Sequence, residues 1–269
     1  MNGLRRYAAG SARVIRRSRL RGFLGPHEER LVFVVGCPRS GTTFTGSALG
    51  SLPGFVDMDE VTPLKAALPE LALLPEVDAA RELRRIVERV RLFGLARGLR
   101  GVEQTPETSF VVRAALRAYP QATAVHVVRD GRDVVCSLLE RGWFREAHDG
   151  ADDAGHPYGA QPRFWVEPER REEFSRVSEA RRAAWAWRRY VSAAGAGAKE
   201  TVRYESLVSD MRRLSPVLGC PEESLEEVFA PFRASSIGRW RDDLSPEQLA
   251  DVEAEAGALL ARLGYTLSE

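Results

Sequence analysis

The hydrophobic pattern of the chain begins with a short block of β-branched and aromatic residues that no polar residue interrupts. This block, Leu31-Val-Phe-Val-Val35, predicts a strand buried on both faces. A second block of similar character covers residues 122–128. Each block is followed by a turn and a helical pattern, the first from Thr42 and the second from about Asp133. This alternation predicts a three-layer α/β fold, with a central, mostly parallel sheet flanked by helices.

Three further stretches carry apolar residues at helical spacing, and they cover residues 75–99, 179–194 and 245–263. The last begins with Ser245 as a capping residue, continues with proline at the first helical position, and stops at Gly264. A short strand is predicted over residues 201–204.

Residues 142–175 follow neither pattern, because glycines, prolines and charges are scattered through them. The segment also carries the aromatic residues Trp143, Phe144, Tyr158, Phe164 and Trp165. Loops of this length inside a compact domain are usually lids or binding loops. We therefore expect residues 31–269 to form a single domain with a lid-like insertion at about 142–175.

The first thirty residues are basic, and no carboxylate precedes Glu28. Their arginines are Arg5, Arg6, Arg13, Arg16, Arg17, Arg19, Arg21 and Arg30. The continuous apolar stretch of a signal peptide is absent. We expect residues 1–30 to form a solvated tail, either helical or disordered. Contact with an anionic membrane surface is the alternative.

Composition excludes some classes of function. The 269 residues carry 39 Lys+Arg against 38 Asp+Glu, a formal net charge of +1, which argues against a nucleic-acid binder. Lysine occurs twice, as Lys65 and Lys199, so phosphate-binding chemistry falls mainly on arginine. The three cysteines lack the spacing of a disulfide framework or metal site, and the apolar runs are too short for a membrane span. These features predict a cytoplasmic protein without a metal centre.

A glycine-rich loop, Gly36-Cys-Pro-Arg-Ser-Gly-Thr-Thr43, connects the first predicted strand to a predicted helix. Such a loop directs backbone N–H groups and the positive helix end at an anion. The GxxxxG spacing is that of a P-loop, so the predicted fold is P-loop-like. However, Thr42 occupies the position of the lysine that holds a nucleoside triphosphate. Because Arg39 supplies the cation instead, the loop predicts a site for a less charged anion.

A second motif, Val127-Val-Arg-Asp-Gly-Arg-Asp-Val-Val-Cys-Ser137, lies at the carboxyl end of the second predicted strand. Open α/β sheets bind ligands at this edge. Arg129 and Ser137 are separated by a turn and about two helical turns, so both can face one pocket. A guanidinium and a hydroxyl suit a second phosphate. Asp130, Arg132 and Asp133 predict an ion-pair network that caps the helix.

Together, CPRSGTTF at 37–44 and VRDGRDVVCS at 128–137 resemble the two donor-binding motifs of the PAPS-dependent sulfotransferases, where PAPS is 3′-phosphoadenosine 5′-phosphosulfate. The Pro-Arg-Ser-Gly form is similar to that of the bacterial, Golgi-type and tyrosylprotein branches. Shorter similarities occur at Glu103-Gln-Thr-Pro106, Val202-Arg-Tyr-Glu205, 235–240 and 263–265.

The resemblance implies a donor site for PAPS, with 3′,5′-ADP as the product and no metal. In the family, the first motif holds the 5′-phosphosulfate and the second holds the 3′-phosphate. The residues implied are Pro38, Arg39, Ser40, Gly41, Thr42, Thr43, Arg129, Ser137 and Arg239.

The resemblance also implies a catalytic base. The tyrosylprotein branch has its base at the position of Glu60, with Asp57, Asp59 and Glu103 as competing carboxylates. In-line displacement at sulfur then gives Glu60 the proton of the acceptor hydroxyl, while Arg39 stabilises the leaving phosphate oxygen. The lid histidines, His148 and His156, are further candidate bases.

Gln104 departs from the family pattern, because related branches carry lysine before Thr-Pro. This departure keeps a catalytically inactive nucleotide-binding homologue open as an alternative. A P-loop kinase acting on a small molecule is the enzymatic alternative, although neither lysine falls in the loop. The acceptor expected for a sulfotransferase without a secretory signal is a small molecule or glycan that carries a hydroxyl.

Overall fold

The computed structural model describes residues 3–18 and 26–265. Its centre is a parallel sheet with the strand order β2-β3-β1-β4-β5. The strands are β1 (Val32–Val35), β2 (Phe55–Asp59), β3 (Arg100–Glu103), β4 (Thr123–Val128) and β5 (Glu200–Arg203). This confirms the predicted α/β class and the parallel sheet.

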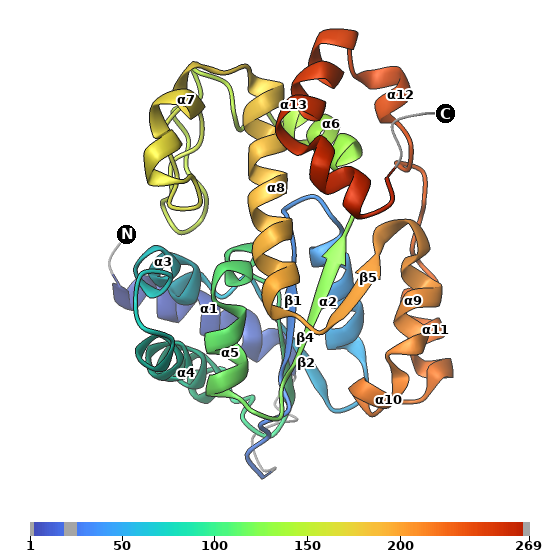
Figure 1. Ribbon diagram of the computed structural model, residues 1–269. Helices are drawn as coiled ribbons and strands as arrows, with labels where there is room; N and C mark the ends of the chain where they lie inside the picture. Colours follow the sequence, from blue (N-terminus) through green and yellow to red (C-terminus); the bar gives the residue numbers. More distant parts are fainter. Residues whose placement is uncertain (1–2, 19–25, 266–269) are drawn as a thin grey trace.

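Helices surround the sheet on both faces and above its carboxyl edge (Figure 1). The helices are α1 (Gly3–Ser18), α2 (Thr42–Ser51), α3 (Thr62–Leu71), α4 (Glu76–Phe93), α5 (Val112–Ala118), α6 (Gly131–Arg141), α7 (Arg171–Arg176), α8 (Glu179–Gly197), α9 (Leu207–Arg213), α10 (Ser215–Leu218), α11 (Glu222–Phe229), α12 (Trp240–Asp243) and α13 (Pro246–Arg262). Short 3-10 helices are η1 (Pro106–Val111), η2 (Pro168–Arg170) and η3 (Tyr204–Ser206).

Strand β1 shows how its sequence produces the three layers. Successive side chains of a strand point to opposite faces, and every residue of β1 is buried. Phe33 and Val35 pack into a core with α1, α3, α4 and α5. Val32 and Val34 pack on the other face with α2, α9, α10 and α11. Because both faces need apolar side chains, the uninterrupted apolar run is what β1 requires.

A third cluster of buried apolar residues lies above the carboxyl edge of the sheet, where α6, α8 and α13 meet (Figure 1). Trp185 and Trp187 of α8 are both fully buried in it. Helix α13 starts as predicted, because the Ser245 hydroxyl accepts the Gln248 N–H and the Gln248 side chain accepts the Ser245 N–H.

The strand order brings the two sequence motifs together. Strands β1 and β4 are neighbours, with Val35 opposite His126 in the register. The loop after β1 and the turn after β4 therefore leave the same edge of the sheet. The connections from β1 and β4 then run to opposite sides, which is the arrangement that creates a ligand-binding crevice in open α/β sheets.

Residues 3–18 of the predicted basic tail form helix α1, which packs against β2, α3 and α4. Val14 is fully buried in that contact. Arg13 and Arg17 pair with Asp59 and Asp57, so α1 is held by charge as well as by apolar contact, and it is not the solvated tail expected. Arg19 and Arg21 lie outside the described residues. No helix in the described ranges is long and apolar enough to cross a membrane.

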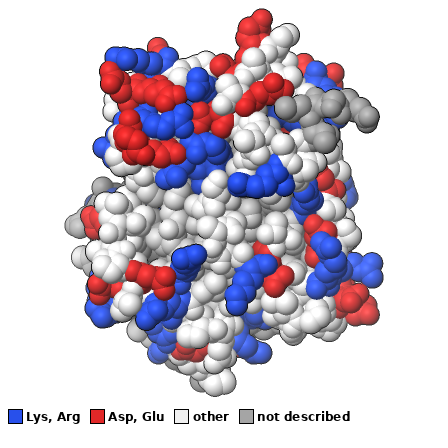
Figure 2. Space-filling view, viewed as in Figure 1, with Lys and Arg blue, Asp and Glu red and all other residues white. Residues whose placement is uncertain are grey.

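The lid-like segment is largely irregular, with a single β-bridge between Ala151 and Pro157, and it ends in η2 and α7. Two of its aromatic residues, Phe144 and Trp165, are buried in the cluster around α8. On the face viewed in Figure 2, acidic and basic side chains are interspersed around a largely uncharged centre, in keeping with the balanced net charge.

Candidate functional site

The loop between β1 and α2 has a backbone that its glycines permit. Gly36 and Gly41 have φ values of 150° and 91°. A Cβ on Gly36 would lie 2.4 Å from the Val127 carbonyl oxygen, and one on Gly41 would lie 2.6 Å from the Tyr204 ring. Arg39 also has positive φ, at 72°. The tight loop brings the first N–H groups of α2, which no side chain caps, to the sheet edge.

A cavity of about 450 Å³ lies over this loop, and we call it the arginine cavity. Its lining includes these residues from the two motifs: Arg39, Gly41, Thr42, Thr43, Arg129 and Ser137. Arg239 and Arg233, from the segment before α12, lie on its other side. Tyr204 and Phe232 add aromatic surface, with ring centroids 5.0 Å apart.

Arg39 joins the two motifs directly, because its Nε donates a 2.9 Å hydrogen bond to the Ser137 hydroxyl on α6. Burial lowers the pKa of Arg39, and the neighbouring Arg141 and Arg129 lower it further. A cluster of guanidinium groups with this mutual repulsion favours an anion between them.

Arg129 is held by the backbone on both sides. Its Nη1 donates to the Arg39 carbonyl at 3.1 Å and its Nη2 to the Ser236 carbonyl at 2.6 Å. Its Nε has no partner, and the buried Ser40 hydroxyl has none either. Buried polar groups normally have partners. Arg129 lines the arginine cavity, so its Nε is free to bind a ligand oxygen, whereas Ser40 lines neither cavity.

Arg239 reaches the arginine cavity with its guanidinium already engaged. Glu140 and Asp243 hold it through hydrogen bonds, which raise its pKa. Asp133 on α6 accepts the N–H groups of Gly238 and Trp240, at 2.8 and 3.1 Å, and thereby fixes this segment over the cavity.

The capping role predicted for the second motif is present. Asp130 accepts the Arg132 N–H as the cap of α6, and it pairs with the Arg132 guanidinium at 2.7 Å. Glu205 accepts the Asp130 N–H at 2.8 Å and the Tyr265 hydroxyl at 3.0 Å. Glu205, from the similarity at 202–205, therefore contacts the second motif, and Tyr265, from the similarity at 263–265, contacts Glu205.

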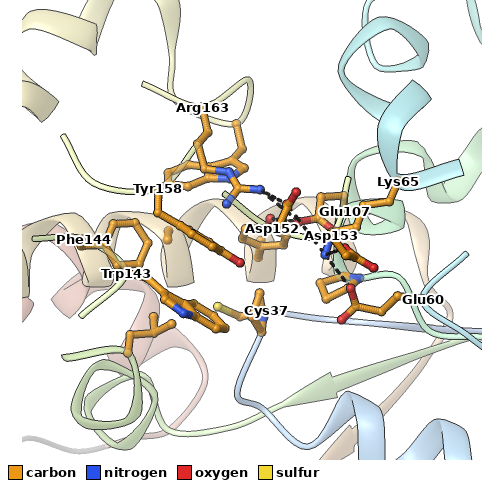
Figure 3. A pocket seen from close by; sticks show the side chains of 16 residues that line it. Cys37, Glu60, Lys65, Glu107, Trp143, Phe144, Asp152, Asp153, Tyr158 and Arg163 are labelled. Carbon is orange, nitrogen blue, oxygen red and sulfur yellow. Dashed lines mark hydrogen bonds and ion pairs between the residues drawn. The ribbon is translucent and has the colours of Figure 1, made fainter. Parts of the chain in front are cut away.

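A second cavity, of about 250 Å³, lies on the other side of the loop, and we call it the acidic cavity (Figure 3). Cys37 and Pro38 form part of its wall, so Pro38 lies here and not in the arginine cavity. Charged side chains line one side and aromatic side chains the other. The charged residues are Glu60, Lys65, Glu107, Asp152, Asp153 and Arg163.

Glu60 is the one candidate base from the sequence that lines the acidic cavity. Its Oε2 lies 2.5 Å from Lys65 Nζ. Burial raises the pKa of Glu60, and Lys65 partly opposes that rise. Burial also opposes protonation of Lys65, but Glu107, Glu60 and Asp153 together hold its pKa above the usual range. Each charge of the pair thus stabilises the other against the effect of burial.

The other candidate carboxylates have structural partners. Asp57 accepts from the Ser47 hydroxyl and pairs with Arg17, and Asp59 pairs with Arg13 and Arg17 of α1. Glu103 is fully buried, where it accepts the Thr105 N–H at 2.7 Å and the Thr108 hydroxyl at 3.0 Å. Burial raises the pKa of Glu103 to about 7.

Gln104, at the position of the family lysine, is also turned to Asp59. Its Nε2 donates to Asp59 Oδ1 at 2.9 Å, while its Oε1 is buried without a partner. The lid histidines do not line either cavity described here. His148 accepts the Gly150 N–H, and His156 lies 3.2 Å from Asp152.

Glu107, Asp152 and His156 have ligand atoms within 4.8 Å of one another, which is the spacing of a metal site. Arg163 already supplies a cation there, with its Nη2 2.7 Å from Asp152 and 3.5 Å from Glu107. The Arg163 guanidinium therefore occupies the Asp152 side of this cluster, so the cluster fits an ion pair better than a metal.

The loop and α6 form a common wall between the cavities. Cys37 and Pro38 face the acidic cavity, while Arg39, Gly41, Thr42 and Thr43 face the arginine cavity. On α6, Leu138 lines the first and Ser137 the second. Helix α8 supports both sides: Trp187 Nε1 donates to the Arg129 carbonyl at 3.1 Å, and the Tyr190 hydroxyl donates to Glu107 at 3.0 Å.

Solved structures with the same architecture are sulfotransferases. The sulfotransferase domain from the curacin biosynthetic pathway has a TM-score of 0.59 at 13% identity, covering 90% of this chain and 100% of that domain. The sulfotransferase domain of the Synechococcus olefin synthase has a TM-score of 0.56 at 15% identity, covering 91% and 99%. The chain has the fold of a sulfotransferase.

A sulfotransferase from Mycobacterium avium gives a TM-score of 0.50 at 14% identity, covering 97% of this chain and 85% of that one. No protein-family model matches the chain, and no curated protein does. At these identities the likeness establishes the sulfotransferase fold but not the reaction.

Apart from Glu60, the charged residues of the acidic cavity carry no signal in the sequence. Lys65 is one of two lysines, but nothing in the local sequence predicts its pairing with Glu60. Glu107, Asp152 and Arg163 come from η1 and the lid, and their spacing in the chain carries no motif. A sulfotransferase fold brings them together through tertiary packing.

Proposed function

We propose that this protein is a PAPS-dependent sulfotransferase that moves a sulfuryl group to a hydroxyl of a small-molecule or glycan acceptor. The observation that carries the proposal is the pair of cavities separated by one anion-binding loop. In-line displacement requires donor and acceptor on opposite sides of the transferred sulfur. A loop with an arginine-lined cavity on one side and a carboxylate on the other suits that requirement.

The residues of the arginine cavity fit the donor. Arg39, Arg129 and Ser137 offer guanidinium and hydroxyl donors for phosphate oxygens. The unpartnered Arg129 Nε is a buried polar atom that such an oxygen would satisfy. When bound, PAPS supplies a sulfuryl group already activated by its phosphate leaving group.

On the acceptor side, Glu60 takes the proton of the attacking hydroxyl. Its raised pKa makes it a stronger base than an exposed glutamate, and Lys65 keeps it ionised and oriented. The acceptor oxygen forms the new S–O bond as the S–O bond to the donor phosphate breaks. Arg39 stabilises the negative charge that develops on the leaving phosphate oxygen.

Calorimetric titration with 3′,5′-ADP and with ATP tests the donor. We expect 3′,5′-ADP to bind without magnesium and more tightly than Mg-ATP, because the loop lacks the lysine that a triphosphate needs. Tighter binding of Mg-ATP would contradict the proposal and favour the small-molecule kinase.

Transfer itself is tested with radiolabelled PAPS and a panel of alcohols and phenols. We expect labelled product from at least one acceptor. Binding of 3′,5′-ADP without transfer to any acceptor would instead favour the inactive homologue, for which Gln104 in place of the family lysine is the motivating observation.

A further inference from the structure

The acidic cavity carries an excess of negative charge. Its lining carboxylates are Glu60, Glu107, Asp152 and Asp153, and its lining cations are Lys65 and Arg163. Arg13 of α1 approaches from outside, with its Nη2 4.0 Å from Asp153. Behind the lining, Glu103 adds a buried carboxyl group and His156 contacts Asp152. With Arg13 included, the lining carboxylates still outnumber the permanent cations.

Of the four lining carboxylates, Glu107 has the longest ion pair, and its Oε1 also accepts the Tyr190 hydroxyl. Lys65 Nζ lies 2.5 Å from Glu60 and 3.0 Å from Asp153, while Arg163 Nη2 lies 2.7 Å from Asp152 but 3.5 Å from Glu107. Glu107 is 3% exposed, and its Oε2 has no hydrogen-bond partner. A buried carboxylate oxygen without a donor is unfavourable, so this atom favours a ligand that donates to it.

The opposite side of the cavity also suits a cation. Trp143 and Tyr158 are stacked, with ring centroids 5.0 Å apart, and Phe144 lies beside them (Figure 3). Aromatic faces attract cations, and the Arg163 guanidinium already lies 5.0 Å from the Tyr158 centroid. The volume of about 250 Å³ limits the occupant to a small molecule.

We propose that the acceptor carries a protonated amine in addition to its hydroxyl, and that Glu107 binds the ammonium group. The inference rests on the proposed function, because it names the acceptor class of that reaction. An ammonium group supplies charge-assisted donors to Glu107 and offsets the excess negative charge. A neutral acceptor offers neither, and an anionic acceptor is repelled.

The test compares matched probes that differ in one amine. The full chain, saturated with 3′,5′-ADP, is titrated with tyramine against 4-ethylphenol and with glucosamine against glucose. We expect the amine-bearing probe of at least one pair to bind about 10- to 100-fold more tightly, the range of a hydrogen bond to a charged group.

Variants test whether residues of the acidic cavity cause the preference for amine-bearing probes. Glu107→Gln keeps the shape and removes the charge, so it should abolish most of the preference. Asp153→Asn changes a side chain that is 42% exposed, which the fold tolerates, and it should reduce the preference to a smaller degree. Glu253→Gln, on the exposed side of α13, is the matched control and should leave it unchanged.

The outcomes separate this inference from the proposed function. If neither amine binds better than its neutral partner, or if the preference survives both Glu107→Gln and Asp153→Asn, the inference is wrong even when sulfuryl transfer is observed. Failure to bind 3′,5′-ADP overturns the proposed function instead. The amine preference is then still measured on the nucleotide-free chain.

Discussion

Glu60 is subject to two opposing effects on one carboxyl group. Burial raises its pKa, whereas Lys65, 2.5 Å away, stabilises the charged form. The result is a carboxylate that is more basic than an exposed glutamate and whose charged form has a close cation. A general base benefits from both properties.

We predict that Glu60→Gln lowers turnover by about 10²- to 10⁴-fold, the usual contribution of a general base. The affinity for 3′,5′-ADP should not change, because Glu60 lines the acidic cavity alone. In the wild type, turnover should rise with pH through a pKa above 4.5, because Glu60 has to lose its proton to act. Steady-state kinetics over pH checks both points.

The matched controls for Glu60→Gln are Asp59→Asn and His156→Gln, which alter candidate bases outside the cavity lining. Both variants should retain turnover within a few-fold of the wild type. Wild-type turnover in Glu60→Gln would transfer the role of base to one of the other candidates.

Arg39 contributes geometry as well as charge. We predict that Arg39→Lys weakens 3′,5′-ADP binding by about tenfold, because lysine keeps the charge but lacks the Nε that donates to Ser137. Arg213→Lys, an exposed change on α9 away from the cavity, is the control and should have little effect. Calorimetry measures both, and equal affinities in the two variants would contradict the prediction.

The motif residues that line the arginine cavity could be located from the sequence, whereas most charged residues of the acidic cavity could not. Arg39, Thr42 and Arg129 follow their strands directly, so the motif and the strand together indicate where they lie. Glu107 and Arg163 have no such local signal. Their proximity depends on how the lid packs against η1 and α8, which only tertiary contacts determine.

Among the elements, α1 differs most from its prediction. It was expected as a solvated tail because its arginines are unbalanced locally. The compensating carboxylates, Asp57 and Asp59, lie in β2, which is distant in the sequence. The helix docks through a few small or apolar residues, such as Val14, that stand among many arginines, so its buried face is narrow and gives a weak signal in the sequence.

We predict that Val14→Ala destabilises the protein more than Arg17→Ala does. Val14 is fully buried, and its truncation leaves a cavity that costs about 1–2 kcal/mol. Arg17 is 37% exposed, so its ion pairs contribute only about 0.2–1 kcal/mol after screening. Thermal denaturation measures which of the two variants is less stable. A less stable Arg17→Ala would show that charge holds α1.

Strands β2 and β3 were not predicted, for a related reason. Strand β3 is four residues long and has charged residues at both ends, Arg100 and Glu103, yet all four residues are buried. Arg100 donates to the Arg30 and Leu218 carbonyls, and Glu103 accepts from Thr105 and Thr108. The partners of Arg100 come from distant segments, and those of Glu103 come from the turn and η1 that follow β3. The longer apolar runs of β1 and β4 needed no such partners and were predicted nearly to the residue.

At the scale of the whole molecule, two buried groups couple stability to pH in opposite directions. The pKa of Glu103 is raised from 4.5 to about 7, so between these values the folded state binds more protons and stability falls as pH rises. Burial lowers the pKa of His126 from 6.5 to about 4, so over that interval the unfolded state binds more protons and stability rises with pH. The two effects largely cancel between pH 4.5 and 6.5.

We predict that Glu103→Gln removes the contribution to stability that falls as pH rises. The stability of the variant relative to the wild type should therefore increase from pH 4.5 to 7, by an amount on the order of 3 kcal/mol. Denaturant unfolding at several pH values measures this difference, in which the other titrating groups cancel. The exposed Glu169→Gln serves as the control, and a constant difference for Glu103→Gln would contradict the prediction.

The scarcity of lysine has a practical consequence for observing the acidic cavity. Lys199 is exposed, whereas Lys65 is 6% exposed and in contact with Glu60 and the lid residue Asp153. An amine-directed reagent therefore has one freely reactive lysine side chain as an internal standard and one that reacts only when the cavity opens. The ratio of the two labels, followed by mass spectrometry, reports how often the lid opens and how far an acceptor keeps it closed.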